Sequence, residues 1–110
     1  EGTVIIKLFL NISKAEQKRR LESRLQDPDK LWKFCMDDLD DRNRWDEFQT
    51  AYQDLIEKTS TPDAPWYIIP ADRKWYRNLV VARLMVEKLR HLQLTFPTPN
   101  FDQASIIIPD

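Results

Sequence analysis

The sequence contains one glycine, one cysteine and one histidine, and each scarcity argues against a class of site. The glycine is Gly2, whereas a phosphate-binding loop needs several glycines so that backbone N–H groups can approach the phosphates. These 110 residues therefore hold neither a Walker A loop nor a dinucleotide-binding loop. One cysteine, Cys35, cannot form an intrachain disulfide, and with His91 alone it cannot build a zinc site. We expect no metal ligands in this chain.

Long apolar runs are also missing. The longest apolar segment, residues 4–12, is interrupted by Lys7 and falls far short of the ~20 residues that a membrane span requires. It also lacks the basic leader of a signal peptide, so we expect a cytoplasmic protein with no membrane partner. A net charge of −1 argues against general nucleic-acid binding.

Two β-branched apolar segments define the expected fold. Residues 4–12 predict a strand buried on both faces, and residues 66–71 predict a second strand that ends at Pro70. Helical patterns lie between and after them, in the order strand, helix, helical hairpin, strand, helix. This alternation indicates an α/β fold with a parallel sheet.

Helix boundaries follow from local signals. Ser13 and Glu16 form a capping box, and the helix that they start should end near Gln26, before the Asp27-Pro28 pair. A long helix should then run to about Lys58. Its apolar stripe consists of Leu39, Trp45, Phe48, Tyr52 and Leu55.

The last helix should cover residues 73–93, with Asp72 as its N-cap. Its inner face is expected to consist of Trp75, Leu79, Ala82, Val86 and Leu89.

Several arginines admit two readings. Arg42 lies on the apolar stripe of the long helix, where it either pairs with Asp38 and Asp46 one turn away or binds an anion. Arg20 and Arg24 lie one helical turn apart. They either belong to a solvent-exposed basic face of the helix or bind phosphate together. The spacing leaves both questions open.

In parallel sheets, ligands bind outside the carboxyl ends of the strands. Here those ends are residues 11–13 and 70–72, and both lead into helix N-termini, which favour anions. The helical hairpin between the strands, residues 27–58, should rise over the same edge as a lid.

Four segments in this order resemble the polyphosphate kinase 2 family: VIIKLFLNISKAEQKRRLESR, DPDKLWKF, D-x-x-x-R-x-x-WD and STPDAPWYIIPADRKWYRNL. The resemblance runs over residues 4–95. It implies a P-loop kinase fold related to thymidylate kinases and phosphoryl transfer between polyphosphate and nucleotides with Mg²⁺. Cys35 and Phe48 stand where serine and tyrosine are frequent, and we expect Cys35 to be a small packing residue.

Matching positions imply the site residues. The resemblance assigns phosphate or polyphosphate binding to Arg20, Arg24, Lys33 and Arg42, and places Asp72 and Lys74 near the nucleotide base. Asp38, Trp45 and Asp46 are expected to be structural, orienting Arg42 and packing the hairpin. The Walker A lysine, the Mg²⁺ ligands and the catalytic aspartate should precede residue 1.

We therefore expect residues 1–95 to form the C-terminal half of a P-loop kinase-like domain, with two strands, three to four helices and the lid, followed by an extended tail at 96–110. The resemblance implies part of a polyphosphate:nucleotide phosphotransferase that acts on ADP, AMP or GDP. We expect these residues alone to be inactive and the whole protein to be a homo-oligomer. Two alternatives stay open: an ATP-dependent nucleoside monophosphate kinase of the thymidylate kinase type, and a non-catalytic helical interaction domain.

Overall fold

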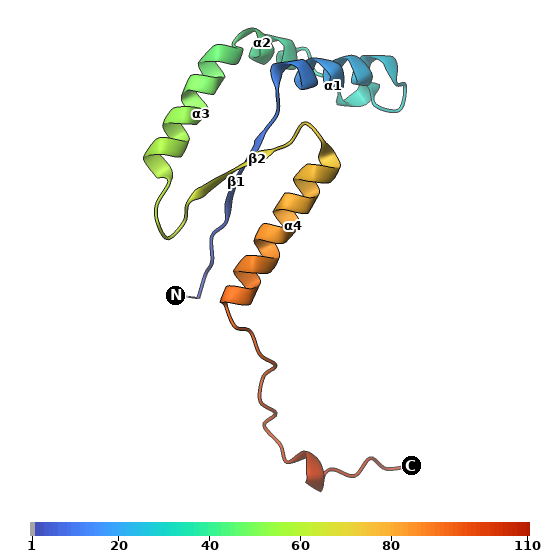
Figure 1. Ribbon diagram of the computed structural model, residues 1–110. Helices are drawn as coiled ribbons and strands as arrows, with labels where there is room; N and C mark the ends of the chain where they lie inside the picture. Colours follow the sequence, from blue (N-terminus) through green and yellow to red (C-terminus); the bar gives the residue numbers. More distant parts are fainter. Residues whose placement is uncertain (1) are drawn as a thin grey trace.

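The computed structural model describes residues 2–110. It contains two strands and four α-helices in the expected order, as Figure 1 shows. The elements are β1 (Lys7–Asn11), α1 (Lys14–Gln26), η1 (Leu31–Lys33), α2 (Asp37–Asn43), α3 (Trp45–Thr59), β2 (Trp66–Pro70), α4 (Lys74–His91) and η2 (Gln103–Ser105).

The two strands pair in parallel, which confirms the expected α/β fold. Lys7 lies opposite Trp66, and Asn11 lies opposite Pro70. The ladder is shorter than residues 4–12 because the partner strand begins only at Trp66, directly after Pro65, which has no N–H to donate. Beyond the ladder, the Ala71 N–H still donates to the Asn11 carbonyl oxygen at 2.8 Å.

Each face of the sheet meets one helix. Side chains alternate along a strand, so Phe9 points toward α3, where its ring centroid lies 5.1 Å from that of Tyr52. On the other face, Tyr67 lies under Lys88 of α4, at 5.5 Å. The expectation that both faces are buried is wrong for this chain, because Ile69 is 2% exposed while its neighbour Ile68 is 57% exposed.

The long helix expected up to Lys58 is broken at Arg44, which separates α2 from α3. Arg44 has φ −101° and ψ 26°, outside the helical region, and its N–H bonds to the Asp41 carbonyl oxygen. The break changes the direction of the chain, so that α2 runs back beside α1 whereas α3 runs down along the sheet (Figure 1).

At α4 the expected inner face is wrong. Trp75 is 63% exposed, and Leu79, Val86 and Leu89 are also exposed. Helix α4 has apolar residues on two sides, and periodicity alone does not say which side meets the sheet. The less exposed side consists of Arg77, Val80, Val81, Leu84 and Lys88.

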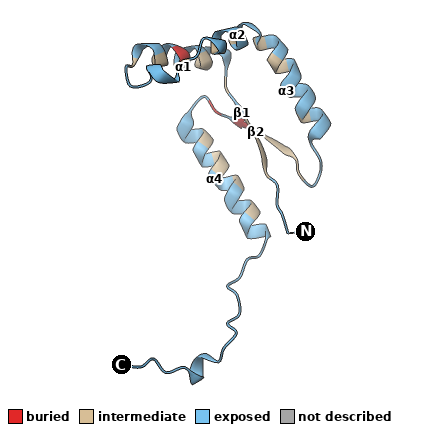
Figure 2. Ribbon diagram, turned by 180° about the vertical axis from the view of Figure 1, so that it is seen from behind, coloured by how far each residue is buried: buried red, intermediate tan, exposed pale blue. Residues whose placement is uncertain are grey.

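The described residues bury few side chains completely. The hydrophobic core consists of Leu21, Ile69 and Ala71, which Figure 2 shows as small red patches on α1 and at the end of β2. The accessible surface is 9697 Å², against about 6,400 Å² for a compact protein of this mass. The radius of gyration is 22.3 Å rather than about 13 Å. Large apolar surfaces of both helices and sheet are therefore uncovered.

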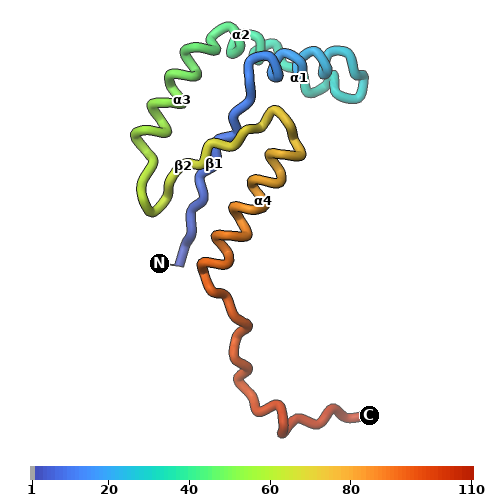
Figure 3. Tube along the Cα trace, viewed as in Figure 1, coloured from blue at the N-terminus to red at the C-terminus, as the bar shows by residue number. Residues whose placement is uncertain are grey.

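The last residues form an arm that runs away from the sheet and the helices (Figure 3). Ile106, Ile107 and Ile108 in this arm are exposed. Cys35 is also exposed, and its expected role as a packing residue is wrong for this chain.

Candidate functional site

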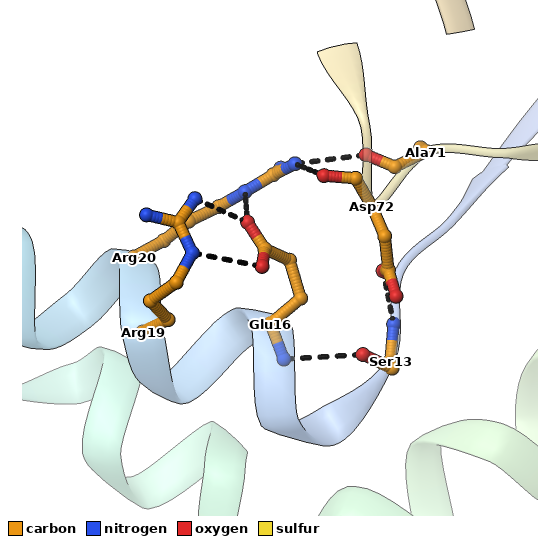
Figure 4. Close-up of polar contacts among 6 residues, drawn as sticks. All are labelled: Ser13, Glu16, Arg19, Arg20, Ala71 and Asp72. Atoms are coloured by element: carbon orange, nitrogen blue, oxygen red, sulfur yellow. Dashed lines mark hydrogen bonds and ion pairs between the residues drawn. The ribbon is translucent and has the colours of Figure 1, made fainter. Parts of the chain in front are cut away.

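Hydrogen bonds join the carboxyl ends of the two strands in a closed ring, which Figure 4 shows. The Ser13 hydroxyl accepts from the Glu16 N–H at 3.1 Å, as the capping box predicts. The Glu16 carboxylate then accepts from Arg20, whose guanidinium also donates to the carbonyl oxygens of Ala71 (2.8 Å) and Asp72 (3.2 Å). The Asp72 carboxylate closes the ring by accepting from the Ser13 N–H at 2.7 Å.

Two sequence-based expectations change here. Asp72 does not cap α4, since the N-cap position belongs to Arg73 and the Asp72 side chain binds Ser13 instead. In a capping box the Glu16 carboxylate would accept a hydrogen bond from the Ser13 N–H. Here that carboxylate binds Arg19 and Arg20, and the Ser13 N–H donates to the Asp72 carboxylate instead. Both changes have one cause: the parallel pairing brings residue 72 beside residue 13, a contact that local sequence signals do not reveal.

The ring also fixes the charge of Glu16. Hydrogen bonds from the Arg19 side chain, supported by Arg20, lower the pKa of the Glu16 carboxyl group from 4.5 to about 2. The same contact with Glu16 raises the pKa of Arg19. At neutral pH, Glu16 is therefore ionised and holds two guanidinium groups in place.

Beside the ring lies a cleft of about 330 Å³ lined by seven cationic side chains and one serine, referred to here as the basic cleft. Its residues come from α1, the η1 turn and the start of α4, three segments that are distant in the sequence. They are Arg19, Arg20, Ser23, Arg24, Lys30, Lys33, Lys74 and Arg77. A cleft with this lining is suited to a polyanion, because no carboxylate side chain forms part of its wall among the described residues.

The cations of the basic cleft differ in how far they are neutralised. Arg24 lies 3.8 Å from Asp38, and Lys30 lies 3.9 Å from Asp27, so both are weakly paired. Within residues 2–110, no carboxylate lies within 4.0 Å of the amino groups of Lys33 and Lys74 or the guanidinium of Arg77. Lys33 instead lies over the ring of the adjacent Trp32, at 5.3 Å.

Four of the six expected site residues therefore meet in one place: Arg20, Arg24, Lys33 and Lys74. Sequence reasoning missed three further wall residues, Arg19, Lys30 and Arg77. A signal existed for each of them. Lys30 precedes Lys33 by three positions, Arg77 follows Lys74 by three, and Arg19 adjoins Arg20.

Arg42 lies outside the basic cleft. Its Nη1 atom donates to the Lys14 carbonyl oxygen at 2.7 Å and to the Gln17 side chain at 3.1 Å, which ties α2 to the first turn of α1. The expected pairing with Asp38 and Asp46 is wrong: Asp38 faces Arg24 instead. Anion binding by Arg42 stays a prediction.

A second cleft, of about 380 Å³, opens at the carboxyl ends of the strands, where the sequence predicts a ligand site. Asp72 lies in its wall, and its backbone oxygen accepts a hydrogen bond at 3.2 Å from Arg20, which also lines the basic cleft. Apolar, amide and hydroxyl groups make up most of this strand-end cleft. Its residues are Asn11, Ile12, Ser13, Trp45, Gln49, Pro70, Ala71 and Asp72.

Metal-binding clusters and membrane-spanning helices are both absent from the part of the chain that the structure describes. Over residues 2–110, His, Cys, Asp and Glu side chains do not gather in groups of three or more that could hold a metal ion. In the same part of the chain, every helix is too short or too polar to cross a membrane.

Comparison with known proteins agrees with the sequence resemblance. The family model for polyphosphate kinase 2 matches residues 1–97. The "AMP/ADP-polyphosphate phosphotransferase" of Meiothermus ruber is 51% identical over 108 residues, which are 98% of this chain and 40% of that protein. The "ADP-polyphosphate phosphotransferase" of Rhodopseudomonas palustris is 41% identical over 96 residues, 87% of this chain and 33% of that protein.

A solved structure is similar over almost the same range. The crystal structure of polyphosphate kinase 2 from Arthrobacter aurescens TC1 matches with a TM-score of 0.92 and 49% sequence identity. The match covers 94% of this chain and 37% of that chain, so this chain spans well under half the length of these relatives. The chain belongs to the polyphosphate kinase 2 family.

Proposed function

We propose that this chain supplies the lid and the C-terminal region of a polyphosphate:nucleotide phosphotransferase. The observation that carries the proposal is the basic cleft, in which seven cations from three segments meet. Polyphosphate is a linear polyanion, and a continuous row of cations is the surface that its electrostatics require. The names of the Meiothermus ruber and Rhodopseudomonas palustris relatives support the same substrate class.

In this proposal the basic cleft binds polyphosphate mainly through the cations that lack a carboxylate partner. Lys33 contributes a point charge, and so does Lys74, which the family resemblance placed near the nucleotide base but which lines this cleft. Arg77 donates from Nε and Nη2 to the Asn78 side chain at 3.2 and 3.1 Å, and it would exchange this neutral partner for phosphate oxygens. The guanidinium of Arg24 lies 3.8 Å from the Asp38 carboxylate, which is a long contact. In this proposal the polyanion replaces Asp38 as the partner of Arg24. Arg20 is a positioning residue, because its guanidinium is already bound to Glu16, Ala71 and Asp72.

The strand-end cleft is our candidate for part of the nucleotide site. Trp45 offers an aromatic surface, and the side-chain amides of Asn11 and Gln49 offer both donors and acceptors. Asp72, which the family resemblance places near the nucleotide base, lies in this wall beside the basic cleft. Polyphosphate and nucleotide would therefore approach each other across the ring of hydrogen bonds.

The reaction itself is an in-line displacement. A phosphate oxygen of the nucleotide attacks the terminal phosphorus of polyphosphate, the P–O bond to the next phosphate breaks, and the shortened polyphosphate leaves with the bonding electron pair. Cations near the phosphates neutralise the charge that spreads over the transferred group. Mg²⁺ would supply further neutralisation of this charge, and we assign none of residues 2–110 to it as a ligand.

Location and assembly follow from the same proposal. Nucleotide substrates place the reaction in the cytoplasm. The uncovered apolar surfaces of α4 and the sheet favour association of copies into a homo-oligomer, with neither nucleic acid nor membrane as a partner.

The test is a donor assay on the intact polypeptide as its organism makes it. The protein is incubated with Mg²⁺, an acceptor (AMP, ADP or GDP) and either polyphosphate or ATP as donor, and the phosphorylated nucleotide is quantified. Product that depends on polyphosphate supports the proposal. Product with ATP alone would assign the protein to the nucleoside monophosphate kinases, and no product with either donor would leave a helical interaction domain.

A further inference from the structure

Glu16 lies behind the wall of the basic cleft rather than in it. Arg19 and Arg20 line the cleft, whereas Glu16 does not, and the Glu16 side chain is 14% exposed. Its carboxylate accepts hydrogen bonds from Nε and Nη2 of Arg19 and from Nε of Arg20, as Figure 4 shows. One carboxylate therefore binds two neighbouring guanidinium groups of the wall.

The contact with Arg19 is bidentate and occupies only one edge of the guanidinium. Nε of Arg19 donates to one carboxylate oxygen at 2.9 Å, and Nη2 donates to the other. Within residues 2–110, Nη1 has no hydrogen-bond partner, and in Figure 4 it points away from Glu16. A two-point contact fixes the plane of the guanidinium, so it also fixes the direction of the remaining N–H groups.

Glu16 is itself held in place by Arg20. Nε of Arg20 donates to the Glu16 carboxylate at 3.0 Å, while Nη2 donates to the carbonyl oxygens of Ala71 and Asp72. The Arg20 side chain is 21% exposed, against 66% for that of Arg19. A series of contacts thus leads from the backbone at the end of β2 through Arg20 and Glu16 to the exposed guanidinium of Arg19.

Most ion pairs at a protein surface are too mobile to orient a side chain. The pair of Glu16 and Arg19 differs because its geometry is bidentate and because a second arginine holds the carboxylate. Hydrogen bonds from Arg19, supported by Arg20, lower the pKa of the Glu16 carboxyl group to about 2, so the group stays ionised throughout the neutral pH range. Without Glu16, the long and exposed side chain of Arg19 would be free to change rotamer.

We propose that Glu16 is a positioning residue for polyphosphate, which holds Arg19 in the orientation in which its remaining N–H groups bind a phosphate oxygen. The inference rests on the proposed function, because it takes the basic cleft to be the polyphosphate site. The hydrogen bonds that carry it join residues of this chain to one another. They require no surface to be open beyond the basic cleft itself.

Charge and orientation predict opposite effects of one substitution. Glu16→Gln removes a negative charge near a polyanion site, which by charge alone would strengthen the binding of polyphosphate. The same change releases the Arg19 side chain, which the polyanion must then immobilise, and this weakens binding. We expect orientation to outweigh charge, because the carboxylate lies behind the guanidinium groups that line the cleft.

The first test measures KM of the intact polypeptide for polyphosphate and for the nucleotide. Glu16→Gln should raise KM for polyphosphate at least about fivefold and leave KM for the nucleotide within about twofold. An unfolded fraction of the variant would lower the apparent kcat but not change KM, so a loss of stability does not imitate this result. The matched control is Glu22→Gln, which removes the same charge from an exposed position of α1, where the carboxylate lies 3.8 Å from Lys18. This control should leave KM for polyphosphate unchanged or slightly lower.

The second test asks whether Glu16 acts through Arg19. Arg19→Ala removes the donor that Glu16 orients, so it should raise KM for polyphosphate by itself. In the Arg19→Ala background, Glu16→Gln has no mobile guanidinium to release, because Arg20 stays bound to Ala71 and Asp72. We therefore expect the double variant to have a KM for polyphosphate no higher than that of Arg19→Ala alone.

Lys74→Ala, measured in the same assay, separates a failure of this inference from a failure of the proposed function. If Lys74→Ala raises KM for polyphosphate while Glu16→Gln leaves it unchanged or lowers it, Glu16 does not position Arg19 and the proposed function stands. Effects of the Glu16 and Arg19 substitutions that multiply in the double variant would overturn the inference in the same way. A protein that forms no product with polyphosphate would overturn both.

Discussion

The guanidinium group of Arg20 holds the carboxyl end of β2: its Nη2 atom donates to the backbone oxygens of Ala71, at 2.8 Å, and of Asp72, at 3.2 Å. The two partners lie 51 and 52 residues away in the sequence, so one side chain of α1 fixes the turn that leads into α4. The side chain is 21% exposed, which shields these contacts from water. This contact links the basic cleft, which Arg20 lines, to the strand-end cleft, which Ala71 and Asp72 line.

Loss of this contact should cost stability. Arg20→Ala removes hydrogen bonds made by a charged donor, each worth about 1.5–3 kcal/mol, so we expect the free energy of unfolding of the intact polypeptide to fall by about 2–3 kcal/mol. Chemical denaturation measures the change. Arg19→Ala is the control, because Arg19 is mostly exposed and binds the same Glu16, and its loss should cost clearly less than that of Arg20. Equal costs for the two arginines would argue against the strand-holding role of Arg20.

The depressed pKa of Glu16 predicts how stability depends on pH. The carboxyl group has a pKa of about 2 in the folded protein, against 4.5 without its arginine partners. Its contribution is therefore complete above about pH 4.5 and is lost as the pH falls toward 2. We expect the free energy of unfolding to decline over this window. Glu16→Gln should reduce the slope there, and an unchanged slope in that variant would show that other carboxyl groups cause the decline.

The basic cleft predicts a selective effect on polyphosphate. Lys74→Ala removes a cation that lacks a carboxylate partner, and we expect KM for polyphosphate to rise about tenfold, the equivalent of ~1.4 kcal/mol, while KM for the nucleotide changes little. Initial rates of the intact polypeptide measure both constants. Lys58→Ala is the matched control, because Lys58 is an exposed lysine on α3, outside the cleft. A rise in the nucleotide KM alone would move Lys74 to the nucleotide site instead.

Arg42 offers a separate test of the lid. Because Arg42 ties α2 to α1, its removal should let the helical hairpin shift, and small displacements of a catalytic site cost large factors in rate. We expect Arg42→Ala to lower the turnover of the intact polypeptide at least tenfold while the circular dichroism spectrum stays that of the folded protein. Wild-type turnover in this variant would exclude a role for Arg42 in positioning or in binding anions.

Burial predicts that two adjacent residues of β2 contribute unequally to the free energy of unfolding. Ile69 is buried on the α4 side of the sheet, so Ile69→Ala should cost about 2–5 kcal/mol of unfolding free energy. Ile68 points to the opposite face and is exposed, so Ile68→Ala should cost about 1 kcal/mol or less. Thermal or chemical unfolding of both variants compares them. A similar loss in both would mean that a further part of the protein covers Ile68.

Local signals predicted the parts of the fold that depend on a few neighbouring residues. Ser13 begins α1 and the Asp27-Pro28 pair ends it, as expected, because a cap and a proline act within one turn. The parallel pairing of β1 and β2 follows from the alternation of strands and helices. The break at Arg44 was missed because helical periodicity on both sides of it is almost continuous.

Long-range contacts explain the remaining differences. Asp72 has the side chain of an N-cap, yet it binds Ser13, which only the folded sheet brings close. On α4, Leu79 and Leu84 both belong to apolar stripes, and the sequence does not indicate which stripe meets the sheet. The basic cleft was predicted in part: Arg20, Arg24, Lys33 and Lys74 were assigned from matching family positions. That they share one cleft depends on the folded arrangement of α1, η1 and α4.

The parallel pairing of two distant strands also affects how the chain is made. Ser13 follows β1 and Asp72 follows β2, and these two residues are 59 positions apart. A ribosome that adds about 5–20 residues per second needs roughly 3–12 s to cover that distance. During this time the apolar strand β1 has emerged without its partner, exposing Leu8 and Phe9 and an unpaired backbone edge. We therefore expect β1 to be prone to aggregation during this interval, and mutations that slow translation between the two strands should lower the soluble yield.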